Sequence, residues 1–187
     1  MSRFVVHTTP INGLLVIERK PIGDERGFLE RLFCQETLGD LMQGKTIRQI
    51  NRTLTQQQGT VRGLHFQYPP YSETKIVSCL KGKVLDVAVD LRKGSPTFLQ
   101  HHAVELSEQN HQSYVIPEGF AHGFQTLTTG CEMLYFHTAD YNADAEAALN
   151  ALDPRLAIAW PQSITERSVR DVNHSMLTQE FAGIALT

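Results

Sequence analysis

The stretch from Arg62 to Asp90 holds the residues whose types and spacing best suit chemistry. It places a histidine, an amide, a lysine and two carboxylates on segments that otherwise read as buried β-structure: His65, Gln67, Lys75, Asp86 and Asp90. Side chains alternate between the two faces of a strand, so His65 and Gln67 share one face. Burying several polar groups is costly unless they pair with one another or with a ligand. The stretch therefore predicts a polar binding cavity.

A second histidine, His122, lies in the turn from Pro117 to Phe124, whose Pro-x-Gly-x-x-His pattern is a cupin signature. Metal-binding cupins use that histidine as a ligand and supply two more as His-x-His, with a glutamate further on. This chain has His65-Phe66-Gln67 instead, and the cation Lys75 in the region of the glutamate. An ammonium group repels a divalent ion, and the set lacks three nitrogen or oxygen ligands. The pattern predicts no metal site and favours proton transfer.

Short β-rich segments separated by glycine, proline and asparagine must position these groups. Strands are predicted at Leu14–Ile17, Lys75–Cys79, Val84–Leu91, Ala103–Leu106, Ser113–Ile116 and Met133–Phe136. Several short strands at this spacing indicate a sandwich or barrel. Two short helices are predicted, at 35–43 and in the alanine-rich segment 144–152, and both must pack on the sheet to be stable. The polar C-terminal segment, 162–187, is predicted to wrap the barrel.

The bulk composition predicts one ordinary globular domain spanning residues 1–187. A formal net charge of -3 argues against binding nucleic acid through phosphate attraction. The three cysteines, Cys34, Cys79 and Cys131, are widely spaced without a CxxC motif, which fits a reducing cytoplasm. No signal peptide is expected at residues 1–11, and no apolar run reaches the roughly 18 residues of a membrane helix.

Most of the chain resembles the dTDP-4-dehydrorhamnose 3,5-epimerase (RmlC) family of cupins, which are nucleotide-sugar epimerases of deoxysugar pathways. The resemblance rests on an ordered set of motifs from residue 23 to residue 171: Gly23 to Phe28, Gln49-Ile50-Asn51, Val61 to Gln67, Lys75-Ile76-Val77, Asp86 to Arg92, Gly94 to Thr97, Ile116 to Phe124, Leu134-Tyr135, Asp153-Pro154, Trp160-Pro161 and Ser168 to Asp171. It implies a mainly β, cupin-type jelly-roll barrel with a few short helices.

The resemblance also implies a reaction that needs no metal or redox cofactor. The substrate is a nucleoside-diphosphate 4-keto-6-deoxy sugar, whose ketone acidifies the hydrogens at C3 and C5. Epimerisation needs a base, a donor for the enolate oxygen, and an acid on the opposite face. The family assigns these roles to His65, Lys75 and Tyr135, with Asp171 orienting His65.

Further positions match residues that bind the nucleotide, the pyrophosphate or the sugar in the family: Arg26, Gln49, Asn51, Arg62, His122, Arg170 and Asp86. Arginine suits phosphate because its planar fork binds two oxygens at once. Asp86 is expected to line the sugar pocket and hold Lys75 or His65. The family further implies a homodimer with exchanged N-terminal strands, in which Arg26 serves the neighbouring site.

Two departures from the family pattern concern the nucleotide. Arg31 stands where a glutamate is common, and Arg170 replaces the usual lysine. The sequence leaves open a 3-only or 5-only epimerase, a 3,4-ketoisomerase, and relatives acting on other sugar nucleotides. A metal-dependent cupin dioxygenase and a non-enzymatic sugar-nucleotide sensor are the alternatives from other classes.

Overall fold

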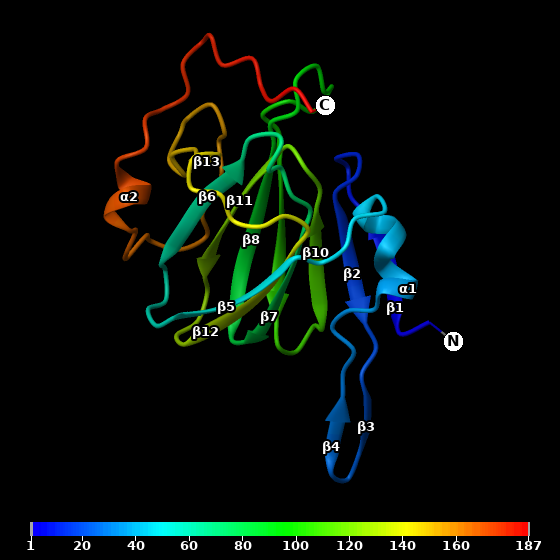
Figure 1. Ribbon diagram of the computed structural model, residues 1–187. Helices are drawn as coiled ribbons and strands as arrows, with labels where there is room; N and C mark the ends of the chain where they lie inside the picture. The colour runs from blue at the N-terminus through cyan, green and yellow to red at the C-terminus, as the bar shows by residue number, and fades with distance from the viewer. Residues whose placement is uncertain (1, 187) are drawn as a thin grey trace.

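A computed structural model describes residues 2–186. Met1 of segment 1–11 and Thr187 of segment 162–187 lie outside the described residues. Two antiparallel sheets form the body of the molecule (Figure 1). The first contains, in spatial order, β1 (Phe4–Thr8), β2 (Leu15–Arg19), β10 (Gln112–Ile116), β7 (Lys75–Lys81), β12 (Cys131–His137) and β5 (Gln49–Thr55). The second contains β13 (Glu146–Ala148), β6 (Val61–Gln67), β11 (Phe120–Thr126), β8 (Lys83–Asp90) and β9 (His101–Ser107). This is the predicted β-barrel of the cupin type.

The main apolar core lies between the two sheets, because each contributes one face of alternating apolar side chains. Val77, Tyr114 and Met133 of the first sheet belong to the same buried cluster as Val84 and Phe124 of the second. Phe124 and Tyr135 of this cluster also line the cavity between the sheets.

Two further clusters cover the outer faces of the sheets. The short helices α1 (Gln35–Leu38) and η1 (Gly39–Met42), in the segment predicted to be helical, bury Leu38 and Met42 against Ile76 of the first sheet. The chain after β12 packs Leu156 and Ile184 against the second sheet. As predicted, the C-terminal segment wraps the barrel, and it forms a short helix, α2 (Val169–Val172).

The prediction of a helix at 144–152 is wrong. This segment contains β13, which pairs with β6 so that Ala148 lies opposite His65. The Asn142 side chain accepts hydrogen bonds from the amides of Asp144 and Ala145, which begins a turn instead of a helix. An available strand edge therefore overrides the helix propensity of alanine.

A glycine contact between β6 and β11 decides which side chains face the barrel interior. A Cβ atom on Gly63 (φ 116°) would lie 2.6 Å from Cα of Gly123, so these strands approach too closely for a side chain. The pairing register shifts here, between His122 and Phe124. This bulge lets Arg62 and His65, three positions apart, both face the cavity, which regular alternation would forbid.

The hairpin of β3 (Ile22–Asp24) and β4 (Gly27–Leu29) projects away from both sheets (Figure 1). It exposes three large apolar side chains, Ile22, Phe28 and Leu29. Among the helices of residues 2–186, none is long and apolar enough to cross a membrane.

Candidate active site

A cavity of about 330 Å³ opens between the two sheets, next to the apolar core. Its lining residues come from β5, β6, the β6–β7 connection, β7, β11, β12, the β12–β13 connection, β13, and α2 with the serine that caps it. Among the residues predicted from the sequence, those in the lining are Gln49, Asn51, Arg62, His65, Lys75, His122, Tyr135, Arg170 and Asp171. Arg26 and Asp86 are not among the lining residues.

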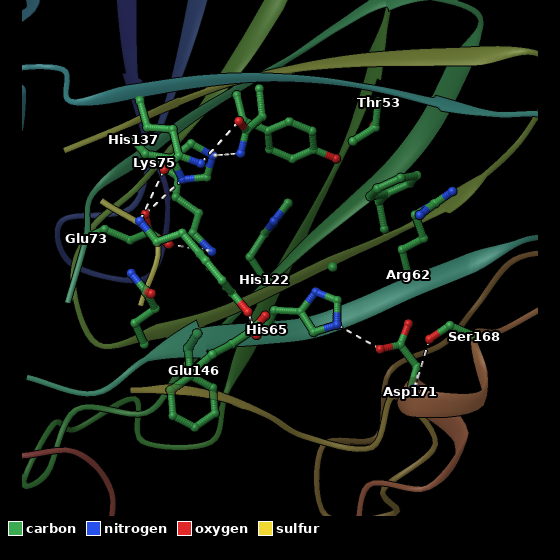
Figure 2. Close-up of a pocket in the computed structure, with 18 of the residues that line it drawn as sticks. Thr53, Arg62, His65, Glu73, Lys75, His122, His137, Glu146, Ser168 and Asp171 are labelled. Carbon is green, nitrogen blue, oxygen red and sulfur yellow. Dashed lines mark hydrogen bonds and ion pairs between the residues drawn. The ribbon is translucent and has the colours of Figure 1, made fainter. Parts of the chain in front are cut away.

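His65 and Asp171 form a direct pair at one wall of the cavity (Figure 2). Nε2 of His65 lies 2.7 Å from Oδ1 of Asp171, and the carboxylate is buried while the imidazole is partly open to the cavity. Ser168 caps α2 by accepting a hydrogen bond from the Asp171 amide, which holds Asp171 in place. Burial opposes ionisation of Asp171, but the hydrogen bond and charge of His65 outweigh it and lower the pKa of Asp171. The carboxylate therefore stays ionised and keeps a proton on Nε2, leaving Nδ1 free to act as a base.

Lys75 lies on the facing sheet within a cluster that the sequence did not indicate. Its Nζ atom is 3.1 Å from Oε1 of Glu73, and Oε2 of the same carboxylate is 2.8 Å from Nδ1 of His137. All three side chains are largely buried (Figure 2). Burial raises the pKa of Glu73, but the charge of Lys75 and the bond from His137 exceed that effect and lower it overall. Lys75 thus places a positive charge in the cavity, and the carboxylate of Glu73 beside it carries the countercharge.

Tyr135 lies on β12, in the sheet that faces His65. Its ring sits between the rings of His122 and His137. Its ring stacks on His137 with centroids 6.0 Å apart and meets the His122 ring edge-on at 6.1 Å. Burial raises the pKa of Tyr135 well above its usual range. The phenol therefore keeps its proton at neutral pH and is available as an acid.

Asp86 occupies a different place from the one predicted. It does not hold Lys75 or His65; its Oδ1 atom pairs with Nε2 of His122 at 2.8 Å, beneath the cavity. The residue is fully buried between core positions of β8, and this burial raises its pKa. The prediction was wrong about its partner because the register of β8 and β11 pairs Asp86 with Phe124, which makes His122, two residues away on the same face, its diagonal neighbour.

Polar side chains linked by hydrogen bonds form the rim of the cavity. The Tyr141 hydroxyl donates to Glu146 at 2.7 Å, and Arg170 pairs with the same carboxylate at 2.6 Å. The hydrogen bond to Glu146 raises the pKa of Arg170. Gln49 donates to Asn51 and accepts from the Tyr141 amide. The Tyr141 ring itself is exposed.

Arg26 and Arg31, two of the arginines singled out from the sequence, do not line this cavity. Arg26 sits at the tip of the projecting hairpin, where it pairs with Asp24 and is 88% exposed. Arg31 is also exposed and does not line the cavity.

Sequence reasoning missed Glu73, His137, Tyr141 and Glu146. Period-two alternation could have found His137 two residues after Tyr135, and Glu73 two residues before Lys75. No comparable signal marks Tyr141 and Glu146, because the turn beginning at Asn142 brings them together.

Three histidine–carboxylate pairs thus surround the cavity: His65–Asp171, His122–Asp86 and His137–Glu73. Across residues 2–186, no three histidine, cysteine or acidic side chains converge as a metal site would require. A polarised imidazole, a buried ammonium and a protonated phenol are the parts of a proton-transfer site. Fold and site together define a cupin-type barrel enzyme that works by acid–base chemistry.

Comparisons with known proteins narrow this class to one family. The profile of the dTDP-4-dehydrorhamnose 3,5-epimerase family matches residues 8–179. The enzyme of that name from Salmonella typhimurium is 41% identical over 177 residues, covering 94% of this chain and 96% of that protein. The chain belongs to the dTDP-4-dehydrorhamnose 3,5-epimerase family and is a carbohydrate epimerase, an isomerase.

Solved structures agree with this membership. The RmlC epimerase of Legionella pneumophila, in complex with dTDP-4-keto-L-rhamnose, has a TM-score of 0.90 at 36% identity, covering 98% of this chain and all of that one. ChmJ of Streptomyces bikiniensis, a 3'-monoepimerase in complex with dTDP-quinovose, has a TM-score of 0.84 at 31% identity. The match covers 91% of this chain and 86% of that one.

Proposed function

We propose that this protein inverts C3 and C5 of dTDP-4-dehydro-6-deoxyglucose to give dTDP-4-dehydrorhamnose, with His65, Lys75, Tyr135 and Asp171 as its catalytic group. One observation carries the proposal. His65, paired with Asp171 of α2, and Tyr135 enter the same cavity from opposite sheets, and Lys75 shares that cavity. A base and an acid on opposite sides of a sugar ring are what inversion requires.

His65 begins the reaction by removing a proton from the carbon beside the ketone. Nδ1 is the base, because Nε2 is bound to Asp171. The proton moves to Nδ1, the C–H electron pair forms the enolate, and negative charge collects on the C4 oxygen. The Asp171 carboxylate stabilises the imidazolium that results.

Lys75 donates to the enolate oxygen, and Tyr135 returns a proton to carbon from the other face. A preorganised donor facing a developing oxyanion is typically worth about 2.7–4 kcal/mol. Inversion at both carbons repeats the sequence once at each centre. Between the two rounds His65 must release to solvent the proton that it took, and Tyr135 must regain one, so that base and acid are both restored.

The rim supplies contacts for the nucleotide. Arg62 and Arg170 offer guanidinium forks for the diphosphate. The exposed ring of Tyr141, held through its hydroxyl by Glu146, offers a flat face on which a base can stack. Gln49 and Asn51 add amide donors and acceptors on β5.

Solvent exchange into the substrate tests this function. Incubated in deuterium oxide with dTDP-4-dehydro-6-deoxyglucose, the protein is expected to place deuterium at C3 and C5 and to invert both centres, as read by proton NMR. Well-folded protein that exchanges neither position in dTDP-, CDP-, UDP- or GDP-4-keto sugars would contradict the proposal. Exchange and inversion at C3 alone would instead assign the 3-epimerase activity for which ChmJ is named.

We further propose a homodimer in which the β3–β4 hairpin carries Arg26 into the partner's site. The hairpin projects from its own subunit and exposes apolar side chains, which a second copy would cover. Arg26 does not line its own cavity, and the resemblance of the sequence to the family implies a nucleotide-binding role for it.

Mixed dimers would reveal which site Arg26 serves. Arg26→Ala and His65→Ala homodimers should both be severely impaired. A purified heterodimer of the two is expected to regain about half the wild-type rate per dimer, since one site then has both residues. Equal impairment in the heterodimer would show that Arg26 acts within its own subunit, and an unimpaired Arg26→Ala homodimer would show that Arg26 serves neither site.

A cytoplasmic location is also proposed. Cys34, Cys79 and Cys131 are all free thiols, and the last two are buried. Proteins of oxidising compartments more often pair their cysteines. Fractionation of the producing cells would check this.

A further inference from the structure

We propose that Glu73 is a positioning residue of this site, which holds the Lys75 ammonium group and fixes the His137 ring against Tyr135. The inference rests on the proposed function, because Lys75 and Tyr135 carry two steps of that reaction. Glu73 itself need not touch the substrate. Its effect passes through the two groups bound to its two oxygens.

A single buried carboxylate links the two groups. Oε1 of Glu73 receives Lys75 at 3.1 Å, and Oε2 receives Nδ1 of His137 at 2.8 Å. Lys75 follows Glu73 by two residues at the start of β7, whereas His137 lies at the end of β12, the neighbouring strand. The register places His137 directly opposite Lys75. Glu73 therefore ties together adjacent strands at the cavity wall.

The contact with Glu73 also selects the tautomer of His137. An ionised carboxylate only accepts, so Nδ1 of His137 carries the hydrogen. Nε2 lies 3.4 Å from the Asn51 side-chain nitrogen, a donor, so Nε2 acts as the acceptor. With both ring nitrogens engaged, the imidazole plane is fixed within 19° of the Tyr135 ring. The orientation of the phenol thus depends on Glu73.

The same contact prepares Lys75 for the enolate. An ammonium group has three donors, so Lys75 can keep its bond to Glu73 while it donates to the C4 oxygen. A donor that is already fixed needs no reorganisation when charge develops. Glu73 also places its countercharge beside the ammonium group before substrate arrives. These effects bear on the chemical step more than on nucleotide binding.

The test is Glu73→Gln, which keeps the side-chain shape and removes the charge. We expect kcat to fall roughly 10- to 100-fold, as for a slightly misplaced catalytic group, with KM changed less than about threefold because the substitution removes none of the groups offered to the nucleotide. Glu132→Gln is the matched control: it breaks the Arg52–Glu132 ion pair on the opposite face of β5 and β12. It should leave kcat unchanged. An unaltered kcat in Glu73→Gln, or an equal loss in both variants, would overturn the proposal.

Nitrogen-15 NMR of the histidine rings gives a readout that does not depend on substrate. His137, assigned by its loss in His137→Gln, is expected to carry its proton on Nδ1 in the wild type and to become a mixture of forms in Glu73→Gln. An unchanged His137 signal in the variant would overturn the positioning role. If the wild type exchanges no substrate, the proposed function fails, while this measurement still decides whether Glu73 fixes His137.

Discussion

Replacing His65 with alanine is expected to abolish both deuterium exchange and inversion. His65 is the base in the proposed mechanism, and its Nδ1 atom faces the cavity while Asp171 engages Nε2. Positioned acid–base groups typically contribute about 10²- to 10⁴-fold. Because the first step cannot proceed without a base, both centres should lose exchange together, with at least a 10³-fold fall in kcat measured by NMR.

The control for this variant is His101→Ala, which removes a histidine of β9 outside the cavity. Its exchange rate should match the wild type. Asp171→Asn should also slow exchange strongly, because an amide cannot hold the imidazole in the same tautomer or stabilise its charge. Substantial exchange in folded His65→Ala protein would assign the base to another residue and remove the core of the mechanism.

Replacing Tyr135 with phenylalanine is expected to separate exchange from inversion. The phenylalanine ring still fits between His122 and His137, so the cavity keeps its shape. His65 can still remove and return a proton on its own face, which admits deuterium without changing configuration. Inversion should fall by about 10²- to 10⁴-fold, the usual contribution of a positioned acid. Proton NMR distinguishes deuterated substrate from epimerised product.

Tyr68→Phe provides the comparison, since that tyrosine is exposed and lies outside the cavity. It should leave exchange and inversion at wild-type rates. Inversion at the wild-type rate in Tyr135→Phe would show that another group protonates the second face. Loss of exchange together with inversion would mean that Tyr135 acts in the first step.

The sequence predicted the architecture well where local patterns were strong. Short alternating segments such as Val84–Leu91 indicated a barrel, and the polar residues between Arg62 and Asp90 indicated a cavity inside it. The helix prediction for the alanine-rich segment 144–152 was wrong because differences in helix propensity are small, about 0.7 kcal/mol or less per ordinary residue. Pairing with the free edge of β6 is enough to reverse it.

The ion-pair partners of the buried charged residues were harder to predict than the residues that line the cavity. Asp86 was expected beside Lys75 or His65, yet its carboxylate binds His122. Lys75 is held instead by Glu73, and that carboxylate extends the network to His137 on another strand. The choice among several buried charges depends on strand register, which a single sequence does not reveal.

The sequence by itself therefore determined a polar cavity in a β-barrel, suited to proton transfer by His65 and Lys75 and poor in metal ligands. Residue types and period-two alternation are local properties, so they can be read along the chain. The pairing of Asp171 with His65, 106 positions apart, was expected only through the family resemblance. The tertiary structure alone decided two things: the close approach of Gly63 and Gly123 lets Arg62 and His65 face the same cavity, and Glu73 binds both Lys75 and His137. Each depends on contacts between strands distant in the sequence, whose register and spacing are fixed only when the whole barrel packs.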